Sequence, residues 1–118
     1  MSNEGQHLDM ATLSELKELM ADEYVVLLET YLNDSAGNLD SIEAAVTQGS
    51  AVELRESAHN FRGSSSNIGA VRLATLSRDI EQKAIANKLS GVDLLLTDIL
   101  DEYKIVQQLL QDELSNLH

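Results

Sequence analysis

The chain has 118 residues, a length that fits one domain, and it contains no cysteine and no proline. Without cysteine there are no disulfides, no thiolate zinc sites and no thiol nucleophile. The formal net charge of −12 argues against binding to nucleic acids or anionic lipid surfaces. The N-terminus does not read as a secretory signal, and no apolar run approaches the length of a membrane span. We therefore expect a cytoplasmic protein.

Apolar residues recur every three to four positions along the chain, which predicts helices and no convincing strand. The low aromatic content of 3% and the frequent leucines also favour an all-α fold. We treat 1–118 as a single domain and expect about residues 1–8 to be flexible. A short first helix over 9–20 then places Leu13, Leu16 and Met20 on one face.

A second predicted helix follows Asp22, which is a suitable N-cap, and its apolar stripe extends to Val46. Gly37 lies inside the stripe and costs a helix interior about 1 kcal/mol. Because the stripe stays in phase across this glycine, we predict one long helix. Gly49 is then expected to end the helix, and Ser50 to cap the next one.

Three further helices complete the predicted fold. The third starts after Ser50 and ends around 67–69, and the fourth follows until the sequence NKLSG breaks it. Ser90 is a plausible cap for the long last helix. Four amphipathic helices joined by short loops predict an antiparallel up-down four-helix bundle, with the short first helix covering one end.

One face of the third helix combines residue types that suggest chemistry. Arg55, His59, Arg62 and Ser66 are separated by steps of four, three and four residues, so they share one row of the helix. Gly63 lies one turn from His59 on the same side. The row places a partly exposed imidazole beside two cations and small side chains.

This row suits an imidazole that carries an anion. A phosphoryl group on a ring nitrogen brings negative charge and acceptor oxygens, which an arginine one turn away can bind. A neutral imidazole is also a competent nucleophile near neutral pH. A single histidine at the border of a helix is more often an ordinary surface residue, so the interpretation depends on the combination of His59, Arg62 and Gly63.

Residues 58–70, AHNFRGSSSNIGA, resemble the signature of histidine-containing phosphotransfer (HPt) domains. That signature is roughly A-H-x-[LF]-[KR]-G-[SA]-[SA]-x-x-[ILV]-G-A. The resemblance extends from the LLETYL helix to the last helix, and it is to stand-alone bacterial members of the family, of the HptB type.

The resemblance implies a role for each matching residue. His59 would be phosphorylated on its distal ring nitrogen, Arg62 would lie near the phosphoryl group, and Gly63 would leave the imidazole accessible. In some relatives a polar residue of the following helix hydrogen-bonds the other ring nitrogen. Glu81 is the best match, with Gln82 adjacent, although that position is often glutamine. A carboxylate there would fix the ring tautomer, and the alternative is an ordinary surface charge.

The resemblance also implies a phosphocarrier rather than an enzyme. His59 would accept a phosphoryl group from a receiver-domain aspartate of a hybrid sensor kinase and pass it to an aspartate of a response regulator. No G-x-x-x-x-G-K sequence is present, so ATP binding and autokinase activity are not expected. Mg²⁺ would come with the acidic pocket of the receiver domain, and this chain is expected to bind no cofactor. Relatives of this kind are commonly monomers.

Apolar residues around His59 are candidates for docking the receiver domain, although they are equally candidates for capping the bundle; they are Leu13, Leu16, Met20 and Ile68. His7 and His118 lie near the chain ends, where we expect disorder, and neither is spaced to form a zinc site with His59. An alternative function is that of a non-catalytic helical adaptor or inhibitor that binds a signalling partner. A buried, hydrogen-bonded His59 would favour this alternative.

Overall fold

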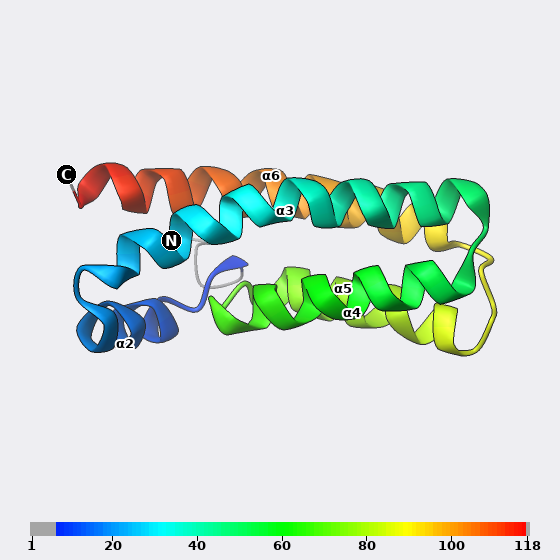
Figure 1. The fold of residues 1–118 in the computed structure, drawn as a ribbon, viewed down its shortest axis with the longest axis horizontal. Coiled ribbons are helices and arrows are strands. Elements are labelled where there is room, and N and C mark those ends of the chain that lie inside the picture. Colours follow the sequence, from blue (N-terminus) through cyan, green and yellow to red (C-terminus); the bar gives the residue numbers. More distant parts are fainter. Residues whose placement is uncertain (1–6, 118) are drawn as a thin grey trace.

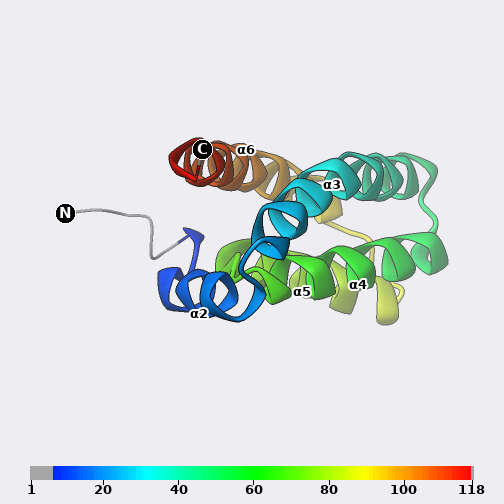
Figure 2. The same ribbon diagram turned by 60° about the vertical axis from the view of Figure 1, so that its left-hand side comes forward.

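The computed structural model describes residues 7–117, in which all five ordered elements are helices. They are α2 (Met10–Met20), α3 (Glu23–Gln48), α4 (Ala51–Asn67), α5 (Val71–Ile85) and α6 (Val92–Asn116). The four long helices alternate in direction, with α3 and α6 in one layer and α4 and α5 in the other (Figure 1). The helix α2 lies at the end of the bundle where α4 ends and α5 begins (Figure 2). The predicted antiparallel up-down bundle with a short extra helix is thereby confirmed.

The core is built from the apolar stripe of each helix, as the periodicity predicts. Its centre holds three aromatic rings, since Phe61 stacks on Tyr31 with centroids 6.3 Å apart and lies 6.2 Å from Tyr103. The Tyr31 hydroxyl is 2.9 Å from Ser65 Oγ, so this buried polar pair is satisfied. Among the helices of residues 7–117, none is both long and apolar enough to cross a membrane.

The predictions for the middle of the chain hold at the level of single residues. The helix α3 continues through Gly37 without a break. Gly49 ends α3 in the left-handed conformation, with φ of 68°. Ser50 then caps α4, because its side chain accepts a hydrogen bond from the Glu53 backbone N–H at 3.3 Å.

Two predicted caps are wrong. Asp22 precedes α3, but it has a helical backbone conformation and its side chain makes no capping hydrogen bond. Ser90 does not cap α6, because the cap residue is Gly91, with φ of 84°. The Ser90 carbonyl instead accepts a hydrogen bond from Lys83 Nζ at 2.9 Å. The backbone conformation alone therefore starts α3 and α6, without a capping hydrogen bond from a side chain. A search of the sequence for capping side chains does not detect such a start.

The N-terminal segment departs from the expected flexibility at two residues. Leu8 is buried in the core, and His7 Nδ1 lies 2.6 Å from Glu102 Oε2 on α6. Arg72 Nε lies 3.4 Å from the other oxygen of this buried carboxylate. The buried apolar side chain and the partnered charge hold the segment against the bundle. The expectation for residues 1–6 and for His118 falls outside the described residues.

Gly69 lies in the turn between α4 and α5 and packs against the start of α2. It has φ of 78°, and an added Cβ would lie 3.1 Å from Thr12 Cβ and 3.2 Å from the Asp9 carbonyl oxygen. The Asp9 backbone N–H donates to the Gly69 carbonyl at 2.8 Å. Gly69 therefore combines a left-handed backbone with close packing, and both favour glycine.

We expect Gly69→Ala to lower the free energy of unfolding by about 1–2 kcal/mol, because alanine strains the left-handed backbone and crowds α2. The matched control is Gly37→Ala, since a Cβ at Gly37 would have nothing within 4 Å. Alanine there should raise the free energy of unfolding by about 0.5–1 kcal/mol. Urea unfolding measures both, and equal effects of the two substitutions would contradict the assignment.

The burial of the three tyrosines predicts how the stability of the protein changes at alkaline pH. Burial raises the pKa of Tyr24 from 10.0 to about 12, and burial also raises the pKa of Tyr31 and Tyr103. The folded state therefore holds these protons more tightly than the unfolded state does, so the stabilisation is complete below pH 10.0 and is lost as the pH rises toward about 12. We expect the urea midpoint to fall over that range. Half-maximal tyrosinate absorbance near pH 10.0 in the folded protein would contradict this expectation.

Candidate functional site

His59 lies on the outer edge of the buried face of α4. Its neighbour Ala58 and the residue Phe61 are completely buried, which fixes the rotation of α4 against the core. One step along the helix turns His59 about 100° out of the core, and its side chain is 60% exposed. The condition that would favour a non-catalytic adaptor, a buried His59, is therefore not met.

Glu81 approaches the ring from α5, the helix packed against α4. Its carboxylate is only 8% exposed, and its Oε2 lies 2.9 Å from His59 Nδ1. Its other oxygen, Oε1, accepts a hydrogen bond from Arg62 Nε at 2.7 Å. A buried carboxylate without partners is costly, so these two contacts stabilise its position. The interpretation of Glu81 as an ordinary surface charge is excluded by its burial.

His59 Nδ1 has two neighbours that compete for it. Besides the Glu81 oxygen, Arg62 Nη2 lies 3.0 Å away. A protonated Nδ1 donates to the carboxylate, whereas an unprotonated Nδ1 accepts from the guanidinium, so only one of these hydrogen bonds exists at a time. The choice between them decides whether the distal Nε2 carries a proton or a free electron pair.

An open depression surrounds the ring on α4 and α5. It has a volume of about 430 Å³ and is lined by Arg55, Glu56, His59, Asn60 and Glu81. Arg55 is among the residues that the sequence pattern predicts for the site, whereas Glu56 and Asn60 are not. The position of Glu56, three residues before His59, would have identified it on the helical wheel.

Other expected site residues lie farther from the ring. Gly63 is exposed on α4, and an added Cβ there would have nothing within 4 Å. Ser66 is exposed and is not part of the depression. Gln82 is exposed on α5 and, among the described residues, makes no hydrogen bond to His59. Of the two neighbours on α5, only Glu81 contacts the ring, because Gln82 is turned about 100° further around the helix.

Two of the four expected docking residues are unavailable for docking. Leu13 and Ile68 are 2% and 1% exposed, because they pack into the core where α2 meets the end of α4. Leu16 and Met20 are half-buried against the same core. Leu13 and Ile68 therefore cap the bundle. Only Leu16 and Met20 keep some exposed surface for a partner.

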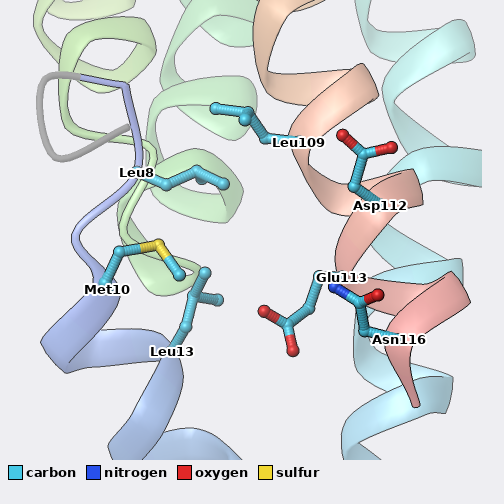
Figure 3. A pocket seen from close by; sticks show the side chains of 7 residues that line it. All are labelled: Leu8, Met10, Leu13, Leu109, Asp112, Glu113 and Asn116. Carbon is cyan, nitrogen blue, oxygen red and sulfur yellow. The ribbon is translucent and has the colours of Figure 1, made fainter. Parts of the chain in front are cut away.

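A second cavity lies between the start of α2 and the end of α6, where Glu113 points into the space between the helices (Figure 3). Its volume is about 150 Å³, below the roughly 300–1,000 Å³ of small-molecule sites. It is lined by Leu8, Met10, Leu13, Leu109, Asp112, Glu113 and Asn116. Residues 7–117 also contain no group of three histidine or carboxylate side chains placed to hold a metal ion. The surface around His59 is therefore the strongest candidate site.

Similarity to known proteins shows which family the chain belongs to. The crystal structure of histidine-containing phosphotransfer protein B (HptB) from Pseudomonas aeruginosa is 41% identical in sequence and superposes with a TM-score of 0.91. The match covers 93% of this chain and 96% of that protein. A comparison with curated protein sequences gives no match. The sequence model of the Hpt domain matches residues 26–118, and the chain therefore belongs to the Hpt domain family.

Proposed function

We propose that this chain is a phosphocarrier in which His59 accepts a phosphoryl group from a receiver-domain aspartate and passes it to an aspartate of a second receiver domain. The observation that carries the proposal is the His59 imidazole, whose Nδ1 contacts a buried carboxylate while most of the side chain faces solvent. Membership of the Hpt domain family supports the same reaction. The donor is a hybrid sensor kinase and the acceptor a response regulator.

The proposed reaction needs a nucleophile and alignment. The electron pair of His59 Nε2 attacks the phosphorus of the aspartyl phosphate, a new N–P bond forms, and the P–O bond breaks with its electrons returning to the aspartate. Because Nδ1 keeps its proton, the phosphorylated ring carries a positive charge. Attack in the reverse direction returns the phosphoryl group to an aspartate. We propose that the chain acts as a carrier without kinase activity, because the phosphoryl group in this reaction comes from an aspartyl phosphate and not from ATP.

Glu81 has two roles in this proposal. By accepting a hydrogen bond from Nδ1–H, it favours the tautomer in which Nε2 is the nucleophile. After transfer, its negative charge faces the cationic phosphorylated ring and stabilises it. Arg62 holds the carboxylate through Nε, and it is also the cation closest to the ring for a bound phosphoryl group. Arg55 lines the same depression and adds a second positive charge.

The partner completes the site. The receiver domain contributes the reacting aspartate and the Mg²⁺ in its own acidic pocket. Gly63 leaves room beside the ring for the approach of the partner, because no side chain projects there. We propose that the chain works as a monomer.

The first prediction concerns the phosphorylated residue. The test receiver is the receiver domain from the same genome that donates fastest to the wild-type chain, supplied as its radiolabelled aspartyl phosphate with Mg²⁺. We expect the wild-type chain to gain an acid-labile, alkali-stable label. His59→Gln should abolish the label without loss of helical circular dichroism, because it removes the nucleophile.

The matched control for this experiment is His7→Gln, which removes a second histidine that is tied to a glutamate far from the site. It should be labelled as fast as the wild-type chain. Equal labelling of the His59 variant, or no labelling of the wild-type chain by any receiver domain of the genome, would overturn the proposed function.

The second prediction concerns the ring tautomer. We expect Glu81→Ala to slow transfer by about tenfold to a hundredfold, because Nδ1 loses its acceptor and Arg62 can then donate to it. Nitrogen-15 NMR of His59 should show a shift of the proton from Nδ1 toward Nε2. Gln82→Ala removes the neighbouring side chain, which does not contact the ring, and should change neither the rate nor the spectrum.

A double variant that also removes Arg62, the donor that competes for Nδ1, extends this test. In Glu81→Ala/Arg62→Ala, Nδ1 has lost both neighbours, and we expect the tautomer populations of a free imidazole. If Glu81→Ala leaves both the spectrum and the rate unchanged, Glu81 does not position the ring.

A further inference from the structure

Charge is distributed very unevenly over the bundle. Residues 51–91, which comprise α4, α5 and the loop that follows, hold six basic and four acidic side chains, a net charge of +2. The rest of the chain holds two basic and sixteen acidic side chains, a net charge of −14. We call residues 51–91 the basic hairpin. It forms one layer of the bundle and carries His59 (Figure 1).

This distribution restricts the approach of an acidic partner. The Mg²⁺-binding pocket of a receiver domain is built from carboxylates, and a chain with a net charge of −12 repels such a surface from most directions. The basic hairpin, with its net charge of +2, is the part of the chain that does not repel an acidic surface. Local positive charge on an otherwise acidic protein both steers the encounter and fixes its orientation.

An apolar groove continues from the depression around His59 along the basic hairpin. It has a volume of about 280 Å³ and is lined by Ala51, Val52, Arg55, Ala84, Ile85 and Asn87. Arg55 lines both the groove and the His59 depression, so the two are contiguous. Val52 is 60% exposed and Ile85 54% exposed. Large apolar side chains this exposed, beside a polar site, are typical of an interaction surface.

Arg55 is the charged residue of this groove. Within residues 7–117 it has no ion-pair partner within 4 Å, whereas Arg62 is bound to Glu81 and Arg72 to Glu102. Its guanidinium is therefore available to a carboxylate of a partner. Arg55 lines the same groove as Val52 and Ile85, so the groove combines exposed apolar side chains with one positive charge that has no ion-pair partner within residues 7–117.

We propose that the receiver domain docks along the basic hairpin, with an apolar side chain in the groove between Val52 and Ile85 and a carboxylate facing Arg55. This inference rests on the proposed function, because it assumes that the receiver domain is the partner of His59. It places the footprint on α4 and α5, toward the start of α4, and away from α2.

The test compares variants that carry the same change at different places. Arg55→Glu and Lys104→Glu both lower the net charge by two, but Lys104 lies exposed on α6. Ile85→Asp and Leu94→Asp both place a charge at an exposed apolar residue, and Leu94 is 69% exposed on α6. Binding to the test receiver is measured by calorimetry, and transfer is measured against receiver concentration. Circular dichroism melts check the fold of each variant.

We expect Arg55→Glu and Ile85→Asp to raise both the dissociation constant and the half-saturating receiver concentration by about tenfold or more. The transfer rate of Ile85→Asp at saturation should stay within about twofold of wild type, because Ile85 does not line the His59 depression. Arg55→Glu should also lower that rate, because Arg55 lines the depression and its positive charge is lost there. Lys104→Glu and Leu94→Asp should change the dissociation constant by less than about twofold, since they lie outside the footprint.

Several results would overturn the docking proposal. Equal weakening by Arg55→Glu and Lys104→Glu would mean that only net charge matters. An unchanged dissociation constant in Ile85→Asp would remove the groove from the footprint, and weakening by Leu19→Asp on α2 in its place would move the footprint to that helix. These results leave the proposed function intact, because that function fails only if the wild-type chain is not labelled on His59.

Discussion

The carboxylate of Glu81 is the group on which the site depends. It lies almost out of solvent between α4 and α5, and a charge in that position requires partners. His59 Nδ1 and Arg62 Nε, both on α4, supply one contact to each oxygen. The interaction that satisfies a buried charge therefore also joins the two helices and orients the imidazole. Stability and ring geometry cannot be changed independently at this residue.

Arg62 is both a support and a competitor in this arrangement. Its Nε neutralises the carboxylate, while its Nη2 lies close enough to take the place of that carboxylate at Nδ1. A negative phosphoryl group on the ring would draw the guanidinium outward and leave Nδ1 to Glu81 alone. Phosphorylation and the Nδ1-protonated tautomer would then reinforce each other. A neutral glutamine in place of Glu81 would couple the two less strongly, because it carries no negative charge to face the cationic ring.

The sequence predicts the fold well because the helical period and the chain breaks are local properties. The continuous α3 and the cap at Ser50 are both legible in a few neighbouring residues. Contacts between segments that are distant in the sequence cannot be predicted from neighbouring residues in this way. The partnership of His7 with Glu102 spans 95 positions, and the choice of Glu81 over Gln82 depends on how α5 is rotated against α4. The helical wheel locates His59 at an edge but does not say which side chain approaches it from the next helix.

Gly63 shows how a cost in folding can point to a requirement outside the chain. It lies inside α4, where glycine costs about 1 kcal/mol relative to alanine. It does not have the positive φ of Gly69, and a Cβ at this position would touch nothing within 4 Å. Neither backbone geometry nor packing therefore explains it, so the bundle alone gives no reason against alanine there. In the proposed function, the glycine preserves open space beside the imidazole for an approaching phosphoryl group and its carrier.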